Sequence, residues 1–143
     1  MPGLDGQKMS KSYGNTIALR EDPTPLTTKL RRMPTDPARV RRNDPGNPDK
    51  CPVWQLHAIY SPQEVQDWVK QGCTSAAIGC VECKQPVIDS VLAELKPIQE
   101  RAREYEQDLN TVQSIINDGC EKARDIARDT LEDVRKSMGL VYR

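Results

Sequence analysis

Residues 85–108 read QPVIDSVLAELKPIQERAREYEQD, a long stretch with the spacing of an amphipathic helix. Its apolar side chains recur at steps of three and four residues, at Ile88, Val91, Leu92, Leu95, Ile98, Ala102 and Tyr105. This spacing places them on one face of a helix, which must be buried against other elements. Pro86 suits the first turn of that helix, whereas Pro97 predicts a kink or a split inside it. The stretch therefore favours an all-α fold.

Two further helices are expected on the C-terminal side of this stretch. Apolar residues from Leu109 to Ile116 predict a short helix that ends at Gly119. A last helix should run over residues 120–138, with Gly139 closing it, because glycine is common just after a helix end. Both would pack an apolar side against neighbouring helices.

Shorter helices are expected on the N-terminal side, over residues 27–33, 53–59 and 61–70. Ser61-Pro-Gln-Glu64 has the pattern of a helix start, with Ser61 as the cap, and Gly72 should end that helix. No stretch alternates convincingly like a strand. Phe is absent, and two Trp and four Tyr are the aromatic residues, so the core must consist mainly of aliphatic side chains. We expect an all-α helical bundle behind an irregular arm.

Composition divides the chain into three parts. Residues 1–24 are rich in Gly, Ser and Pro and should form a loop. Residues 25–50 should be a basic linker with one short helix, because four prolines interrupt positions 34–48. Residues 51–143 should form the helical domain. The chain holds 21 basic and 21 acidic residues, but the first 50 residues carry ten basic against six acidic ones.

Six of those basic residues fall within residues 29–42, against one acidic residue, Asp36. Such a stripe can contact the phosphates of a nucleic acid, and the plainer interpretation is a solvated surface. The six are Lys29, Arg31, Arg32, Arg39, Arg41 and Arg42.

A short motif near the start, Lys8-Met9-Ser10-Lys11-Ser12, lies in a Gly- and Ser-rich segment. Two lysines on such a loop suit a polyphosphate, because lysine is a mobile point charge and exposed backbone N–H groups can turn toward an anion. The loop can stabilise a nucleotide only if another surface holds that nucleotide opposite it.

Four of the five cysteines, Cys51, Cys73, Cys80 and Cys83, have the spacing C-x21-C-x6-C-x2-C. Clustered cysteines in a chain with no secretory signal suggest metal or redox chemistry, and four thiolates suit tetrahedral zinc or an iron–sulfur cluster. The fifth, Cys120, is expected to be a buried small hydrophobe.

The remaining candidates for chemistry have weaker patterns. His57 has no evident Ser or Asp partner in the sequence, so a structural role is favoured for it. Trp54 and Trp68 are expected to pack, although either could shield a metal site or stack on a base.

Several of these motifs together resemble the bacterial tryptophanyl-tRNA synthetases, which are class I aminoacyl-tRNA synthetases. Residues 8–12 match the KMSKS motif of that class, and residues 2–7 and 13–17 match its surroundings in this family. The similarity continues over nearly the whole chain, at residues 35–42, 44–46, 51–57, 79–84 and 138–143.

The resemblance implies an enzyme that activates tryptophan with ATP and Mg²⁺ and then charges tRNA-Trp. It implies that Lys8, Met9, Ser10, Lys11 and Ser12 bind ATP, with Lys8 and Lys11 as the catalytic residues. The helical domain would be the family's anticodon-binding domain, and the full enzyme a homodimer. Residues Arg39, Arg41 and Arg42 are the RNA-contact candidates.

For the cysteines, the resemblance favours a 4Fe–4S cluster bound by Cys51, Cys73, Cys80 and Cys83. Zinc and unoccupied packed thiols remain as alternatives. Any such cluster is expected to shape the RNA-binding surface, and redox catalysis is not implied.

One departure from the family pattern concerns the catalytic half. The family's Rossmann nucleotide-binding domain, with its HIGH motif, should precede residue 1, and we expect it to be absent here. The chain would then be a C-terminal part of the ligase, inactive in isolation. The alternative is a stand-alone RNA-binding or metal-binding helical module without catalytic activity. No apolar run approaches the roughly 18–20 residues that span a bilayer, so we expect a cytoplasmic protein without a membrane partner.

Overall fold

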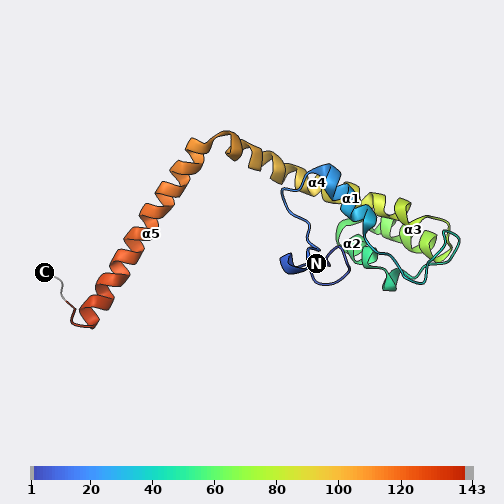
Figure 1. Ribbon diagram of the computed structural model, residues 1–143, viewed down its shortest axis with the longest axis horizontal. Helices are drawn as coiled ribbons and strands as arrows, with labels where there is room; N and C mark the ends of the chain where they lie inside the picture. The colour runs from blue at the N-terminus through green and yellow to red at the C-terminus, as the bar shows by residue number, and fades with distance from the viewer. Residues whose placement is uncertain (1, 141–143) are drawn as a thin grey trace. The chain divides into compact units, whose positions relative to one another are not determined.

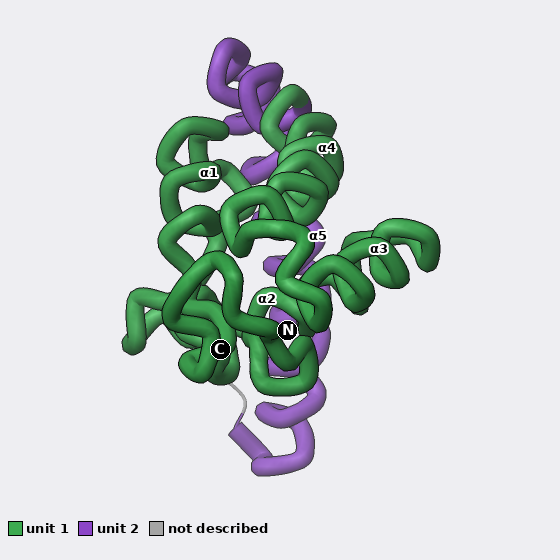
Figure 2. The backbone as a smooth tube through the Cα atoms, turned by 90° about the vertical axis from the view of Figure 1, so that its right-hand side faces the viewer, with its two compact units in different colours: residues 1–100 green, residues 101–143 purple. Residues whose placement is uncertain are grey.

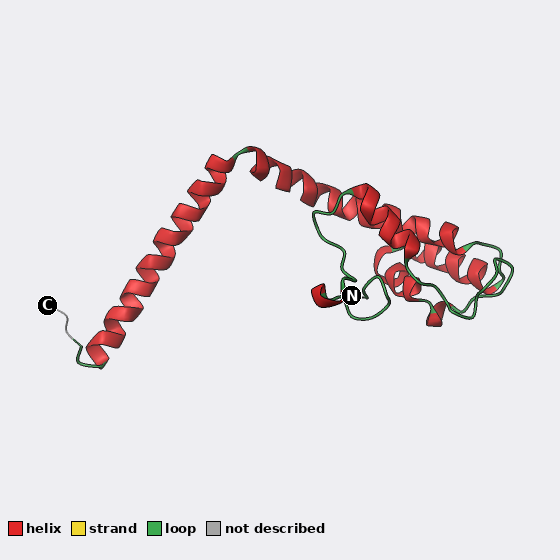
Figure 3. Ribbon diagram, viewed as in Figure 1, coloured by secondary structure: helices red, strands yellow, loops and turns green. Residues whose placement is uncertain are grey.

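The computed structural model describes residues 2–140, and the regular structure in this range is helical (Figure 3). This confirms the all-α expectation. The elements are the short 3-10 turns η1 (Lys11–Tyr13) and η2 (Pro48–Lys50) and the helices α1 (Pro23–Arg32), α2 (Pro52–Tyr60), α3 (Gln63–Thr74), α4 (Cys80–Gln107) and α5 (Leu109–Ser137). Residues 141–143, part of the similarity to the family at the C-terminus, lie outside the described residues.

The chain forms two compact units, residues 1–100 and 101–143 (Figure 2). The first unit holds the arm, the basic segment, helices α1 to α3 and most of α4. The second holds the last turns of α4 and all of α5.

The core of the first unit lies where α1, α2 and α4 meet, and α1 runs alongside α4 (Figure 1). Each helix contributes side chains that are less than a tenth exposed, which is the aliphatic core expected from the composition. They are Leu26, Leu30 and Met33 from α1 and its end, Val53 and Leu56 from α2, and Val87, Ile88, Val91 and Leu95 from α4. Leu4 and Ile17 of the arm pack against the same core.

The expected start and end of the third helix are wrong, and contacts explain both. The side chain of Ser61 does not cap α3, because its Oγ lies 2.8 Å from Nδ1 of His57. The helix also runs past Gly72 to Thr74. Gly72 serves close packing instead, since a Cβ there would lie 2.9 Å from side-chain carbons of Ile78.

The two long helices are also less divided than the sequence predicts. Helix α4 continues through Pro86 and Pro97, and α5 continues through Gly119 and Cys120. The break between them falls at Asp108, whose carboxylate accepts a hydrogen bond from the Thr111 N–H at 3.1 Å and so caps α5.

Helix α5 buries none of its residues. Four of its apolar side chains, Ile115, Ile126, Leu131 and Val134, are 46–70% exposed. Within residues 2–140, no helix is long and apolar enough to cross a membrane.

Candidate metal centre and lysine-bearing loop

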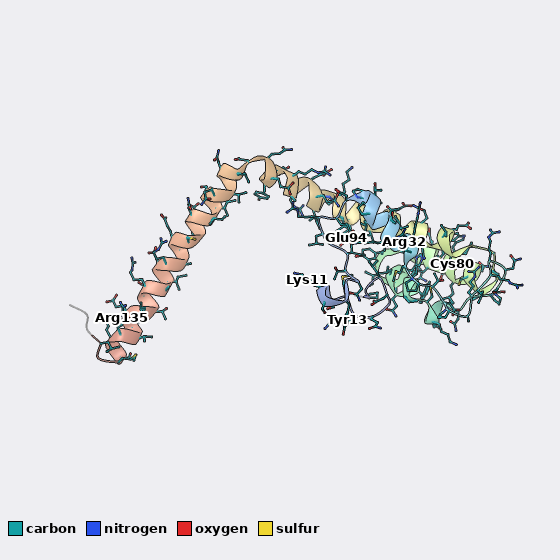
Figure 4. The ribbon with its side chains drawn as sticks, in the orientation of Figure 1. Lys11, Tyr13, Arg32, Cys80, Glu94 and Arg135 are labelled. Atoms are coloured by element: carbon teal, nitrogen blue, oxygen red, sulfur yellow. The ribbon has the colours of Figure 1, made fainter. Side chains whose placement is uncertain are left out.

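The loop of residues 8–12 presents both of its lysines to solvent. Lys8 and Lys11 are exposed, and η1 begins at Lys11, which Figure 4 labels beside Tyr13. Gly14 follows with a φ of 65°, a conformation that glycine adopts without strain. The hydroxyls of Ser10 and Ser12 lie 2.8 Å apart. The loop therefore carries two exposed cations on a tight turn.

Asn15 organises this loop from the inside, and sequence reasoning missed it. Its side chain is 3% exposed. Its Oδ1 accepts a hydrogen bond from the Ser10 N–H at 2.7 Å, and its Nδ2 donates to Asp5 at 2.7 Å and to the Lys8 carbonyl at 3.2 Å. One amide thus holds three points of the loop. The same hydrogen bond from Asn15, followed by one from the Gln7 N–H, lowers the pKa of the Asp5 carboxyl.

The basic segment separates into buried and exposed arginines. Arg41 and Arg42 are exposed, whereas Arg39 is only 9% exposed. A groove of about 680 Å³ lies between this segment and the start of α4. It is lined by Arg39, Val40, Arg41, Arg42, Gly79, Cys80, Val81, Glu82 and Gln85.

The four clustered cysteines come together, as the spacing predicts. Cys51 caps α2, Cys73 lies in the last turn of α3, and Cys80 and Cys83 lie in the first turn of α4. All four line one cavity of about 20 Å³, together with Thr35, Asp36, Arg39 and Val53. Among residues 2–140, however, no three His, Cys, Asp or Glu side chains are arranged to hold a metal ion. The thiols therefore share a cavity without converging on one point.

Burial favours the protonated form of two of these thiols, Cys83 and Cys73. It raises the pKa of Cys83 to about 12, with the charges of Cys51, Cys73 and Cys80 adding to the effect. Burial also raises the pKa of Cys73, against the influence of Arg39. Thiols of this kind lose their protons readily only when a metal binds them, because the metal replaces the proton as the positive partner.

The surroundings of the cavity suit such a group. The guanidinium of Arg39 reaches Cys73, with 3.9 Å between Nη1 and Sγ, and the buried Nε of Arg39 has no hydrogen-bond partner. Gly46 leaves room for the thiol of Cys73, since a Cβ at Gly46 would lie 2.5 Å from that sulfur. The donor set, the buried cation and the glycine together fit a negatively charged metal–thiolate group.

Lys84 is a second buried cation, next to Cys83 in the chain, and its burial is not evident from the sequence. Its side chain is 6% exposed, and Nζ donates to the carbonyls of Arg31 at 2.7 Å and Met33 at 2.6 Å. Burial lowers the pKa of Lys84, while the charges of Cys80, Cys51 and Cys83 oppose that shift.

His57 is fully buried next to Cys83 and has a partner on each ring nitrogen. Nε2 lies 3.0 Å from the Cys83 carbonyl, and Nδ1 lies 2.8 Å from the Ser61 hydroxyl. Because a carbonyl can only accept, Nε2 carries the proton and Nδ1 accepts from Ser61. Burial lowers the pKa of His57, and the bond to Cys83 opposes this. The arrangement is that of a satisfied core histidine.

The structure also shows the surroundings of Cys120 and of the two tryptophans. Cys120 is exposed on α5, so the expectation of a buried cysteine is wrong. The error arises because α5 buries none of its residues. Trp68 on α3 is 40% exposed, while Trp54 lies with its ring centre 6.2 Å from that of His57.

Comparison with known families and sequences gives a consistent result. The model of the family described as tRNA synthetases class I (W and Y) matches residues 1–96. The chain is 59% identical to a tryptophan–tRNA ligase of Ralstonia nicotianae, over 99% of this chain and 36% of that protein. It is 47% identical to a tryptophan–tRNA ligase of Thermotoga maritima, over 99% of this chain and 44% of that protein.

A solved structure agrees with the sequence comparison. The tryptophanyl-tRNA synthetase of Campylobacter jejuni, crystallised with ADP and tryptophan, superposes with a TM-score of 0.84 at 25% identity. The superposition covers 97% of this chain and 43% of that one. The chain thus spans about two fifths of the length of the relatives it matches.

Proposed function

This chain belongs to the class I tRNA synthetases of the W and Y family, and on that basis we propose that it is part of a tryptophan–tRNA ligase. The observation that carries the proposal is the alignment over 99% of the chain with proteins named tryptophan–tRNA ligase. The family description covers synthetases for two amino acids, W and Y, and the name of these relatives indicates W, tryptophan. A stand-alone RNA-binding or metal-binding module is not favoured, because the alignment includes residues 8–12 as well as the helical part.

In the proposed reaction, the tryptophan carboxylate attacks the α-phosphate of ATP, and tryptophanyl-adenylate and pyrophosphate are formed. The tRNA-Trp then takes the tryptophanyl group from the adenylate. Negative charge grows on the departing pyrophosphate in the first step. Lys8 and Lys11, both exposed on the loop, supply cations that act most strongly in that transition state. Ser10, Ser12 and Met9 complete the ATP-contacting loop.

Lys11→Ala tests this role in the full-length ligase. We expect adenylate formation to fall by about 10²–10³-fold, with a much smaller loss of ATP affinity, because the interaction is made in the transition state. Single-turnover adenylate formation and equilibrium ATP binding measure the two effects. Lys50→Ala, at an exposed lysine outside the loop, is the matched control. Equal losses of rate and affinity would contradict the role.

The helical part is proposed to meet the tRNA. Exposed Arg41 and Arg42 at the rim of the 680 Å³ groove support contacts to phosphates, and buried Arg39 supports them indirectly. Filter binding of tRNA-Trp at several salt concentrations, with a mismatched-anticodon tRNA as control, tests this contact. Unchanged binding and salt dependence in an Arg41→Met, Arg42→Met double variant would exclude it.

The thiol cavity is proposed to hold a 4Fe–4S cluster on Cys51, Cys73, Cys80 and Cys83, with zinc as the alternative. The support for this proposal is the donor set, because the four thiols line one cavity and thiolates are the ligands of such clusters. The cluster would supply a covalent cross-link between the starts of α2 and α4 and the end of α3.

Anaerobic purification tests this assignment. We expect iron and sulfide in the protein, with the visible sulfur-to-iron absorbance of a cluster. Cys80→Ser should remove most of the iron, whereas Cys120→Ser, at the exposed cysteine of α5, should not. Zinc in place of iron would select the alternative metal, and a colourless protein free of both would reject the centre.

A further inference from the structure

Arg39 is a buried cation whose hydrogen bonds all go to neutral groups. Its side chain is 9% exposed. Nη2 donates to the carbonyl of Arg42 at 2.8 Å and to that of Ile78 at 2.6 Å, and Nη1 lies 3.9 Å from the sulfur of Cys73. The buried Nε has no partner. Carbonyls satisfy the N–H groups, but they do not balance a full positive charge.

The acidic groups of the described chain do not form an ion pair with Arg39. Within residues 2–140, no carboxylate lies within ion-pair distance of its guanidinium. The charge of Asp36, in the same cavity, interacts with that of Arg39, but the two Asp36 oxygens accept hydrogen bonds from the N–H groups of Ala38 and Asn47 instead. The buried Lys84 also donates to carbonyls. Two buried cations without an ion pair are unfavourable, because a buried charge loses its hydration.

The thiol cavity offers the missing anion. Protonated thiols are neutral, but four thiolates around zinc or around an iron–sulfur core form a group with net negative charge. Arg39 lines this cavity and touches Cys73, so its charge faces the place where that anion would form.

We propose that Arg39 is a positioning residue for the thiol centre. Its guanidinium offsets the negative charge of the metal–thiolate group and connects the basic segment around residues 39–42 to that group. The inference rests on the proposed centre. The guanidinium holds the carbonyl of Arg42, a lining residue of the 680 Å³ groove, and that of Ile78, which precedes the lining residue Gly79, while it reaches Cys73. One side chain therefore links the filling of the centre to the shape of the groove.

Two substitutions separate the charge role of Arg39, which offsets the metal–thiolate charge, from its linking role, which holds the carbonyls of Arg42 and Ile78. Arg39→Met removes the charge and the hydrogen bonds, whereas Arg39→Lys keeps the charge but cannot span the three partners. Arg41→Met, at an exposed arginine of the same loop, is the control. Each variant of the chain is purified anaerobically. Its iron content, the reduction potential of the cluster and the hydrogen–deuterium exchange of peptides covering residues 40–46 and 76–82 are then compared.

The charge role predicts a lower reduction potential in Arg39→Met, because reduction adds an electron to a group that has lost its nearby cation. We expect the reduction equilibrium to shift about tenfold, which is about 59 mV for a one-electron couple. Arg39→Lys should restore most of this shift. The linking role predicts at least tenfold faster exchange around residues 42 and 78 in both Arg39 variants, but not in Arg41→Met.

These outcomes distinguish the inference from the proposed centre. If Arg39→Met matches Arg41→Met in potential and in exchange, the inference is overturned while the centre stands. If the wild-type chain holds neither iron nor zinc, the centre fails and the charge role fails with it. The exchange comparison still decides the linking role in that case, because it needs no metal. Arg39→Lys keeps the test valid if Arg39→Met does not fold.

Discussion

Asn15 is the residue on which the geometry of the lysine-bearing loop depends. Its amide connects the backbone of Ser10 and Lys8 with the carboxylate of Asp5, and it does so while almost fully buried. An asparagine side chain has both donors and an acceptor, so it can close a loop that no single donor or acceptor could close. Gly3 fits against it without a side chain, because a Cβ there would overlap Asn15.

Replacing this residue gives a prediction with a defined pH dependence. The hydrogen bond from Asn15 is the main cause of the lowered pKa of Asp5, so Asn15→Ala should move that pKa upward. A carboxyl with a lowered pKa stabilises the folded state above its unfolded pKa, about 3.9, and that stability is lost as the pH falls through the folded pKa. The loss of folded-state stability as the pH falls should therefore be smaller in Asn15→Ala than in the wild type.

Titration of the Asp5 carboxyl by NMR measures the shift directly. Asn43→Ala, at an exposed asparagine, serves as the control and should leave Asp5 unchanged. An Asp5 pKa that is equal in the wild type and in Asn15→Ala would contradict the assigned role.

At the same scale, the sequence identifies residues that carry a motif and misses residues that act through their surroundings. Lys8, Lys11 and the four cysteines are predicted as candidates because their chemistry and spacing are visible in the chain. Arg39 and Lys84 resemble surface cations in the sequence. Their burial depends on carbonyls of residues up to 53 positions away, as in the bond from Lys84 to Arg31, and a single sequence does not display such pairs.

At the scale of the elements, periodicity predicted the helices better than it predicted their ends. Pro97 predicts a kink or a split and Gly119 predicts a helix end, yet both lie inside continuous helices. A long helix can lose one hydrogen bond or one side chain and continue, because the neighbouring turns hold it. The actual boundary at Asp108 has a weak sequence signal, because Asp is one of the favoured N-cap residues.

Gly119 gives a prediction for helix α5. A Cβ at this exposed position would meet no heavy atom within 4 Å, so Gly119→Ala should stabilise the helix by about 0.5–1 kcal/mol. Circular dichroism during thermal unfolding measures the change. Gly139→Ala is the matched control with the opposite sign, because Gly139 ends the helix with a φ of 68° that alanine adopts poorly. A stabilisation by both substitutions would contradict this account.

At the scale of the whole molecule, stability is concentrated in the first unit. The nine residues of its core cluster lie between Leu26 and Leu95, whereas α5 in the second unit buries none of its residues. Burial of apolar area is the main source of folding free energy. The first unit therefore carries the cooperative core, and α5 depends on local helix interactions such as the cap at Asp108.

Removal of residues 101–143 tests this division. We expect the remaining chain to unfold within a few degrees of the intact one, because no core side chain is lost. Differential scanning calorimetry compares the two. A fall of more than about 8 °C would contradict the prediction, since this corresponds to a loss of more than about 1 kcal/mol for a unit of this size.

The placement of the thiols within the first hundred residues has a consequence for how the protein is made. Cys83, the last of the four, precedes the start of the second unit at Arg101. A ribosome adds about 5–20 residues per second, whereas small helical units fold within microseconds to milliseconds. Once the first unit has left the ribosome, the thiol cavity can therefore close in less time than the addition of one further residue takes. Insertion of the proposed metal centre would then have to precede closure of the cavity or reopen it.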